Sequence, residues 1–276
     1  MKKILVTTDF SANSKAGLKF AIQLSLQEKV KLTFFHSYYV MKPTSWESSK
    51  ARSFEIAEVE KLQNQLEKFV ASVYKSMELN DPNAECVLGR SVSADKNIVE
   101  YAKKNHFDFI CISTRGAGAV KKLFGTNTST IIKNSMIPVI SVPSSYKHEK
   151  ISTILYATDL DELQEELKLV VNFNKSLKAK IELLHFDFPA ELHLKEKIMT
   201  AAKKKYSKQN ISLHLANLDI ASSFVSNMES AVKRSKPSVL IMFRHAKKNI
   251  FDKIFAPSYS AEFSFVSKVP MIVFAK

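Results

Sequence analysis

The 276-residue sequence predicts an α/β fold with two similar domains in tandem, each an open five-stranded parallel sheet with helices on both faces. Short, continuously apolar segments alternate with segments in which apolar residues recur every three or four positions. This alternation is typical of buried parallel strands joined by helices. The pattern begins again near residue 150, and a hydrophobic content of 45% is enough for the cores of two domains.

The first half of the chain contains five apolar segments that we interpret as strands. They are residues 3–8, 31–36, 84–88, 107–112 and 139–142. Helical spacing of apolar residues predicts the connecting helices, which are residues 16–26, 53–77, 93–104 and 129–135. A long loop with Pro43 and the only tryptophan, Trp46, precedes the second helix. The first half therefore alternates strand and helix and closes on a fifth strand near Pro143.

The second half repeats the first. Residues 153–159 match residues 3–9 at an offset of 150, residues 180–185 match 31–36 at an offset of 149, and residues 269–273 match 137–140 at an offset near 132. Three matches in the same order indicate an internal duplication. The second copy is shorter, mainly because its counterpart of the long second helix is reduced to about residues 190–208. The polar segment 144–150 is a candidate linker, and we predict domains over 1–146 and 147–276.

A glycine-containing loop follows the fourth predicted strand. Residues 113–127 read Ser-Thr-Arg-Gly-Ala-Gly, then six residues, then Gly-Thr-Asn. A glycine-interrupted turn between a buried strand and a helix directs backbone N–H groups into one concave space, where the helix dipole favours negative charge. This arrangement can bind phosphate. The spacing is equally compatible with an ordinary loop that uses glycine for its turn geometry.

All five glycines lie in the first copy. The corresponding loop of the second copy begins with residues 244–249, Arg-His-Ala-Lys-Lys-Asn. Residues with a Cβ resist positive φ and keep a ligand's phosphates away from the backbone. We therefore do not expect this loop to bind a triphosphate in the same manner. The basic residues of this loop either attract an anion or are simply exposed to solvent.

These residues resemble the universal stress protein family in its tandem form, over essentially the whole chain. In that family the motif Gly-x2-Gly-x9-Gly-[Ser/Thr] after the fourth strand holds ATP phosphates and ribose, and an aspartate after the first strand lies near the nucleoside. Here Gly116 and Gly125 match the second and third glycines, Thr126 the hydroxyl residue and Asp9 the acid. The sequence departs from the motif at Ser113, which replaces the first glycine, and in having eight residues between the other two glycines.

The resemblance implies a Rossmann-like fold of the adenine-nucleotide alpha hydrolase type and a set of nucleotide contacts in the first domain. The predicted contacts to ATP, with Mg²⁺ as its companion, are Asp9, Gly89, Ser113, Arg115, Gly116, Gly125, Thr126 and Asn127. The second copy keeps only Asp159 of this motif. Other interpretations are that Asp9 caps the first helix and that Arg115 is solvated charge. His36 and His185, at the ends of the second strands, are expected in a pocket wall or core.

We expect a cytoplasmic regulatory or binding module of the stress response that binds ATP in its first domain only. The alternatives are a nucleotide-free interaction protein and a slow ATPase. The sequence has no GxxxxGK[ST] loop and no base with an evident partner, so we predict no catalytic residue and no enzyme. The resemblance also implies self-association, with residues 139–142 and 271–274 paired as an internal pseudo-dimer. A homodimer and an unidentified regulatory protein are further expected partners.

Composition argues against several other classes. The net charge of +14 is spread evenly, with +8 in residues 1–148 and +6 in residues 149–276, whereas nucleic-acid binders tend to concentrate charge. No apolar run approaches the roughly 18 residues of a membrane span, and the N-terminus becomes acidic too soon for a signal peptide. Cys86 and Cys111 form no metal-ligand pattern, so we expect reduced thiols and no metal.

Overall fold

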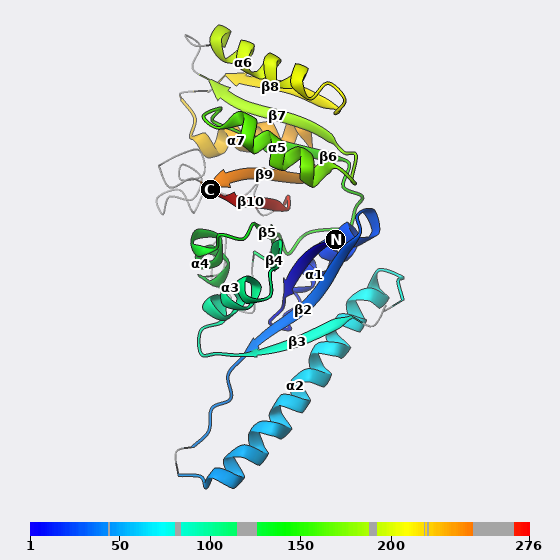
Figure 1. The fold of residues 1–276 in the computed structure, drawn as a ribbon, viewed down its shortest axis with the longest axis vertical. Coiled ribbons are helices and arrows are strands. Elements are labelled where there is room, and N and C mark those ends of the chain that lie inside the picture. Colours follow the sequence, from blue (N-terminus) through cyan, green and yellow to red (C-terminus); the bar gives the residue numbers. More distant parts are fainter. Residues whose placement is uncertain are drawn as a thin grey trace. The chain divides into compact units, whose positions relative to one another are not determined.

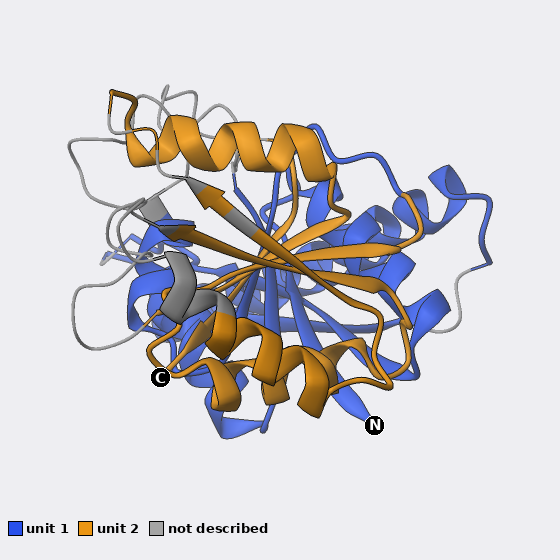
Figure 2. Cartoon of the chain, turned by 90° about the horizontal axis from the view of Figure 1, so that it is seen from above, with its two compact units in different colours: residues 1–120, 124–148 blue, residues 121–123, 149–276 orange. Residues whose placement is uncertain are grey.

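The computed structural model describes residues 1–43, 45–80, 84–114, 126–187, 192–217, 219, 221–244 and 268–276. The chain divides into two compact units, which Figure 2 shows in blue and orange. Unit 1 comprises residues 1–120 and 124–148, and unit 2 comprises residues 121–123 and 149–276. Among the described helices, none combines the length and the apolar character needed to cross a membrane.

Unit 1 is a five-stranded parallel sheet in the order β3-β2-β1-β4-β5 (Figure 1). Helix α1 contacts α2, and α3 contacts α4, which are the pairs that right-handed crossovers place on the two faces of such a sheet. The elements of unit 1 are β1 (Lys2–Thr7), α1 (Lys15–Gln27), β2 (Val30–Tyr38), α2 (Ser48–Ser76), β3 (Glu85–Arg90), α3 (Ala94–Lys104), β4 (Phe109–Ser113), α4 (Thr126–Asn134) and β5 (Val139–Val142).

Unit 2 has the same arrangement, with five parallel strands in the order β10-β9-β6-β7-β8. The fold class predicted from the sequence is therefore confirmed. The elements of unit 2 are β6 (Thr153–Ala157), α5 (Leu163–Asn174), β7 (Lys180–Asp187), α6 (Leu192–Lys205), β8 (Ile211–Asn217), α7 (Phe224–Ser235), β9 (Val239–Arg244) and β10 (Met271–Ala275).

The central strands have the same register in both units. Ile4 lies opposite Leu32, and Ile154, 150 residues later, lies opposite Ile181, 149 residues after Leu32. The central strands are buried on both faces, as the successive buried residues of β1 and β6 illustrate. Burial of both faces explains why these segments are continuously apolar rather than alternating. The register agrees with the internal duplication that the sequence indicates.

Several element boundaries differ from the sequence prediction. Helix α2 begins at Ser48, earlier than expected, and the edge contact of Trp46 with Phe54, with ring centroids 5.1 Å apart, stabilises this added part. Helix α4 begins at Thr126, inside the predicted loop. Strand β3 continues through Gly89, because β2 extends to Tyr38 and supplies pairing partners for it.

Candidate functional site

A tight turn over Thr8, Asp9 and Phe10 ends β1 at the carboxyl edge of the unit 1 sheet. Phe10 has φ = 62°, which is uncommon for a residue with a side chain and costs roughly 1–2 kcal/mol. Two bonds hold the turn: the Phe10 N–H donates to Thr8 Oγ1 at 3.0 Å, and the Ser11 N–H donates to Asp9 Oδ1 at 3.0 Å. The Asp9 carboxylate is exposed to solvent. The turn therefore presents a negative charge at the strand end.

His36, at the end of β2, supports this turn from the side. Its Nδ1 lies 2.8 Å from the Thr8 carbonyl oxygen, and its ring lies against Phe10 with centroids 4.1 Å apart. Burial lowers the pKa of His36 below its usual value, and the Thr8 carbonyl and the Asp9 carboxylate oppose this only in part. The ring is therefore neutral at pH 7. His36 forms part of a half-buried aromatic wall, in agreement with the sequence interpretation.

Ser113 links the end of β4 to helix α1. Its buried hydroxyl accepts a hydrogen bond from the Gly17 N–H at 2.9 Å and donates to the Ser14 carbonyl at 3.1 Å. The Thr128 hydroxyl of α4 donates to the Ser113 carbonyl at 3.0 Å. The Ser113 side chain thus has a structural role that the family motif does not indicate. Gly17 was missed by sequence reasoning, yet a Cβ there would lie 3.1 Å from Ser113 Oγ.

Replacing Ser113 with alanine is expected to lower the free energy of unfolding of unit 1 by about 1–3 kcal/mol, because a buried N–H and a buried C=O lose their partner. Urea unfolding, followed by Trp46 fluorescence and far-UV circular dichroism, measures this loss. Ser72→Ala is the matched control, since the exposed Ser72 hydroxyl bonds only within its own helix. Equal stability of the two variants would contradict the role assigned to Ser113.

Packing alone explains why residue 89 is a glycine, whether or not a ligand binds nearby. It lies within β3 opposite Ser37, and a Cβ at this position would lie 2.3 Å from Cζ of Phe35 and 2.7 Å from Nδ2 of Asn97. Asn97 in turn donates to the Ser37 hydroxyl at 2.8 Å. A side chain therefore does not fit here. Contact of Gly89 with a nucleotide stays a prediction.

The remaining predicted contacts come from the loop and the start of α4. Arg115, Gly116 and Gly125 lie outside the described residues. Thr126 and Asn127 form the first turn of α4, and Asn127 is exposed. Strands β1 and β4 are neighbours, and the chain leaves them in opposite directions, to β2 and to β5. Ligands of open α/β sheets bind in the crevice at such a switch point.

Unit 2 contains the same turn at the end of β6. Leu160 has φ = 73°, and its N–H donates to Thr158 Oγ1 at 3.0 Å. The Asp161 N–H donates to Asp159 Oδ1 at 3.2 Å, and His185 Nδ1 lies 2.8 Å from the Thr158 carbonyl oxygen. These contacts match those of unit 1 one by one. The turn therefore forms in a copy whose sequence lacks the glycine loop.

Beneath this turn, unit 2 has a buried carboxyl group, whereas no aspartate or glutamate is buried among the described residues of unit 1. Glu166 lies in the first turn of α5 and is 1% exposed. It accepts hydrogen bonds from the Tyr156 hydroxyl and, at 3.3 Å, from Thr158 Oγ1. Burial and the adjacent Glu166 raise the pKa of Tyr156 well above its usual value. Unit 2 thus places a buried, hydrogen-bonded carboxyl group behind its strand-end turn.

An aromatic cluster replaces the Ser113 link in unit 2. Ile4 of β1 pairs with Phe109 of β4, and the equivalent Ile154 of β6 pairs with Val239 of β9. Phe243 follows Val239 at the same distance along the strand as Ser113 follows Phe109, so Phe243 occupies the position of Ser113. The Phe243 ring stacks on Phe274 with centroids 5.0 Å apart and meets Tyr156 edge to face at 5.8 Å. At this register position unit 2 therefore has aromatic packing between strands, where unit 1 has a polar contact between β4 and α1.

No metal centre is evident in the part of the chain that the structure describes, where no group of three or more His, Cys, Asp or Glu side chains gathers. Cys111 is fully buried, and burial raises the pKa of its thiol. A protonated, buried thiol is a poor nucleophile and a poor metal ligand. Cys111 is therefore a core residue of unit 1.

The fold and the two strand-end turns define a class: a tandem α/β protein with a Thr-Asp turn at the carboxyl edge of each parallel sheet. Residues 1–143 match the model of the Universal stress protein family. The chain belongs to the universal stress protein family. No curated protein matches this sequence.

Solved structures with the same fold extend over the whole chain. A universal stress protein from Archaeoglobus fulgidus DSM 4304 is 13% identical, with a TM-score of 0.69 over 99% of this chain and 98% of that one. A functionally unknown protein from Pseudomonas aeruginosa PAO1 is 11% identical, with a TM-score of 0.60 over 100% of this chain and 92% of that one. At these identities the likeness concerns the fold alone.

Proposed function

We propose that this universal stress protein is a cytoplasmic regulatory module that binds ATP, with Mg²⁺ as its companion, through unit 1 only. The observation that carries the proposal is the carboxyl edge of β1 and β4. There the exposed Asp9 turn lies at the sheet's switch point, and a loop sequence with glycines at 116, 118 and 125 leads into α4. A helix N-terminus after a glycine loop favours phosphate.

The described residues also suit the nucleoside end of ATP. The half-buried rings of Phe10 and His36 offer an aromatic surface next to the Asp9 carboxylate, which can accept hydrogen bonds from hydroxyl or amino groups. His36 is neutral at pH 7, so it adds no charge of its own. No described residue forms a nucleophile–base pair here, which favours binding over catalysis.

Unit 2 supports an asymmetric arrangement. Its loop sequence, which begins at Arg244, has no glycine. Residues with a Cβ keep a ligand's phosphates away from the backbone, so a triphosphate is disfavoured there. Pairing of the last strands, β5 with β10, and any homodimer or regulatory partner remain proposals that rest on the sequence.

The expected result is one ATP per chain, measured by titration calorimetry. Asp9→Asn keeps an acceptor for the Ser11 N–H but removes the charge, and we expect it to weaken ATP binding about tenfold or more. Asp159→Asn is the matched control, because the same turn in unit 2 should not touch the nucleotide. Gly116→Asp, which adds a side chain and a negative charge to the loop, should abolish binding, whereas Ala246→Asp should leave it unchanged.

Several outcomes would contradict the proposal. Two binding sites in the parent protein would contradict the asymmetry. Equal losses of ATP affinity in the unit 1 variant and its matched unit 2 control would contradict it as well. Conversion of bound ATP to ADP, detected by mass spectrometry, would indicate an ATPase. Absence of any bound nucleotide at millimolar ATP would favour the nucleotide-free interaction protein.

A further inference from the structure

The edge at which the strands of unit 2 begin, opposite to the arrowheads in Figure 1, gathers basic residues. Because the strands are parallel, each connecting helix returns the chain to this edge. Three segments extend from the last turn of α5, α6 or α7 to the first residue of the next strand: residues 171–180, 202–211 and 232–239. Backbone bonds join them, since the Ile181 N–H donates to the Asn210 carbonyl at 2.8 Å and the Ser238 N–H to the Thr153 carbonyl at 2.9 Å. We call these three segments the basic edge.

The basic edge concentrates the positive charge of the second half of the chain. It contains ten lysine and arginine residues and no aspartate or glutamate. Residues 149–276 as a whole have a net charge of only +6, so the remainder of this half is net negative. The even division of charge between the two halves therefore conceals an uneven distribution within unit 2. Such concentration on one edge is the electrostatic feature expected of a surface that binds a polyanion.

Helix dipoles alone do not account for this charge. Lysines in the last turn of a helix interact favourably with its dipole, so some are expected at such an edge. Unit 1 has the equivalent segments after α1, α2 and α3, residues 24–30, 73–85 and 101–109. These hold four basic and five acidic residues. Because the same fold with the same helix ends forms in unit 1 without a basic edge, the basic edge of unit 2 has a purpose other than folding.

Most of the basic residues have no negative partner in the described part of the chain. Lys180 pairs with Glu182 at 2.7 Å, and Lys205 donates to Gln164 Oε1 at 2.8 Å. Nη1 of Arg234 lies 3.1 Å from a histidine ring nitrogen of β8. The other seven are exposed and form no ion pair with a described residue: Lys175, Lys178, Lys203, Lys204, Lys208, Lys233 and Lys236. These seven lysines can therefore meet an external anion.

The length of the basic edge indicates which polyanion matches its charge. Its segments enter β9, β7 and β8, which are three strand spacings apart in the order β9-β6-β7-β8, or about 14 Å. A nucleic-acid duplex carries one phosphate charge per roughly 1.7 Å of its axis, and hence about eight over this length. An extended acidic peptide has one residue per roughly 3.4 Å, and hence about four charges at most. The duplex matches the seven lysines more closely.

The uncharged side chains of the basic edge also suit phosphate groups. Ser176, Ser207 and Asn210 are exposed between the lysines, and hydroxyl and amide groups of this kind commonly contact the nucleic-acid backbone. Leu177 is buried, and none of the exposed large apolar side chains of the described chain lies in these segments. Stable binding to a membrane surface usually requires an apolar or lipid anchor besides basic residues. Nucleic acid is therefore favoured over a lipid surface.

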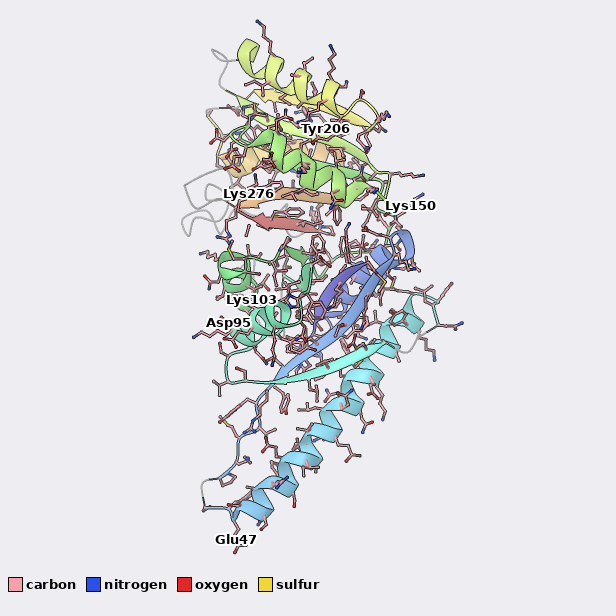
Figure 3. All side chains as sticks on the ribbon, viewed as in Figure 1. Glu47, Asp95, Lys103, Lys150, Tyr206 and Lys276 are labelled. Carbon is pink, nitrogen blue, oxygen red and sulfur yellow. The ribbon has the colours of Figure 1, made fainter. Side chains whose placement is uncertain are left out.

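We propose that the basic edge of unit 2 binds the phosphate backbone of a nucleic-acid duplex without reading its sequence. The seven lysines neutralise phosphates, and the exposed hydroxyl and amide groups add hydrogen bonds to them. A single strand is disfavoured, because binding of unpaired bases relies on exposed aromatic rings. Of the two rings in these segments, Phe173 is buried, and the half-buried Tyr206, labelled in Figure 3, has Lys205 Nζ 5.9 Å from its centroid. The proposal does not depend on ATP binding by unit 1.

The test measures fluorescence anisotropy of a fluorescein-labelled DNA duplex with the full-length protein. We expect a dissociation constant of about 1–10 μM at about 50 mM salt and a steep loss of affinity as the salt concentration rises. The double variant Lys203→Gln/Lys204→Gln removes two exposed charges from the last turn of α6. It should weaken binding about tenfold or more and reduce the slope of log K against log salt concentration by about two.

Lys103→Gln/Lys104→Gln is the matched control. These two lysines are also consecutive and exposed in the last turn of a helix, but they belong to α3 of unit 1, as the label of Lys103 in Figure 3 shows. We expect this variant to keep the affinity and the salt slope of the parent. Equal losses in the two double variants would mean that the overall positive charge attracts the duplex, and this outcome would overturn the proposal.

Other ligands identify the source of the phosphates. An RNA duplex of the same sequence is measured beside the DNA duplex, and binding of either one that Lys203→Gln/Lys204→Gln weakens supports the proposal. A DNA duplex of unrelated sequence should bind equally well. No binding of either duplex at low salt would overturn the proposal. Tighter binding to poly-glutamate, or to vesicles of phosphatidylserine and phosphatidylcholine, would also overturn it, because the occupant would then be an acidic protein or a membrane.

Discussion

Replacing Tyr156 with phenylalanine is expected to lower the free energy of unfolding of unit 2 by about 2–3 kcal/mol. Tyr156 is fully buried, and its hydroxyl donates to the buried carboxylate of Glu166. Phenylalanine fills nearly the same volume, so the change removes the donor and leaves the packing in place. Hydrogen bonds to charged groups are worth more than those between neutral groups, and a buried carboxylate that loses one is poorly solvated.

The effect should be confined to unit 2. The only tryptophan, Trp46, belongs to unit 1, so its fluorescence follows unit 1, whereas far-UV circular dichroism follows both units. We expect the unfolding transition of Tyr156→Phe to move to a lower urea concentration when it is followed by circular dichroism. The transition followed by Trp46 fluorescence should stay unchanged. Tyr206→Phe is the matched control, because this tyrosine, labelled in Figure 3, is half-buried at the end of α6. Equal shifts for the two variants would contradict a special role of the Tyr156–Glu166 pair.

The same pair predicts a dependence on pH. The folded protein raises the pKa of Tyr156 above its usual value of 10.0, because burial and Glu166 disfavour the phenolate. A raised pKa means that the stabilisation is fully present below pH 10 and is lost as the pH rises through the folded-state value. The stability difference between the parent and Tyr156→Phe should therefore be constant from pH 7 to about pH 9 and shrink above pH 10. A difference that grows at high pH would refute this assignment.

Replacing Gly89 with alanine is expected to lower the free energy of unfolding of unit 1 by about 2–3 kcal/mol. The added Cβ would lie 2.3 Å from Cζ of Phe35. The Phe35 ring has little room to move, because it is fully buried and packs against Tyr101 with ring centroids 4.7 Å apart. Asn97, at 2.7 Å from the added atom, is held by its bond to Ser37. Urea unfolding followed by Trp46 fluorescence measures the loss.

Gly17→Ala provides the comparison for Gly89→Ala within the same unit. Its Cβ would lie 3.1 Å from Ser113 Oγ, a tight contact but a much smaller overlap. Alanine in a helix is more favourable than glycine by about 1 kcal/mol, which offsets part of the crowding in α1. We therefore expect Gly17→Ala to stay within about 1 kcal/mol of the parent. If Gly89→Ala were as stable, the packing explanation for Gly89 would be wrong.

Most of the fold is predictable from the sequence because local patterns and the repeat agree. The match of residues 153–159 to 3–9 locates β6 and its turn without any structural information. The first turns of α2 were missed because residues 48–53 are mostly polar and show no apolar periodicity. Contacts outside that segment, such as those of Trp46 with Phe54 and of Lys42 with Glu55, stabilise the helix there.

The candidate site was less predictable, because its key contacts join distant segments. The position of Asp9 after β1 follows from the strand pattern, but the positive φ of Phe10 does not, since phenylalanine gives no signal for it. In the sequence, Glu166 directly follows another glutamate in an amphipathic segment. Such a pattern predicts a solvent-exposed face of a helix. Only the approach of Tyr156 from β6 reveals that Glu166 is buried. The bond between Ser113 and Gly17 likewise spans two elements far apart in the chain.

The duplicated Thr-Asp turn affects how the divergence of such tandem proteins can be reconstructed. Asp159 bonds the Asp161 N–H as Asp9 bonds the Ser11 N–H, so a requirement for correct folding is sufficient to retain the acid after a copy has lost its loop glycines. The aspartate is then an inherited feature of the scaffold and a poor marker of ligand binding among descendants. Ser113 and Phe243, which occupy the same register position in β4 and β9, record the divergence of the two copies more informatively.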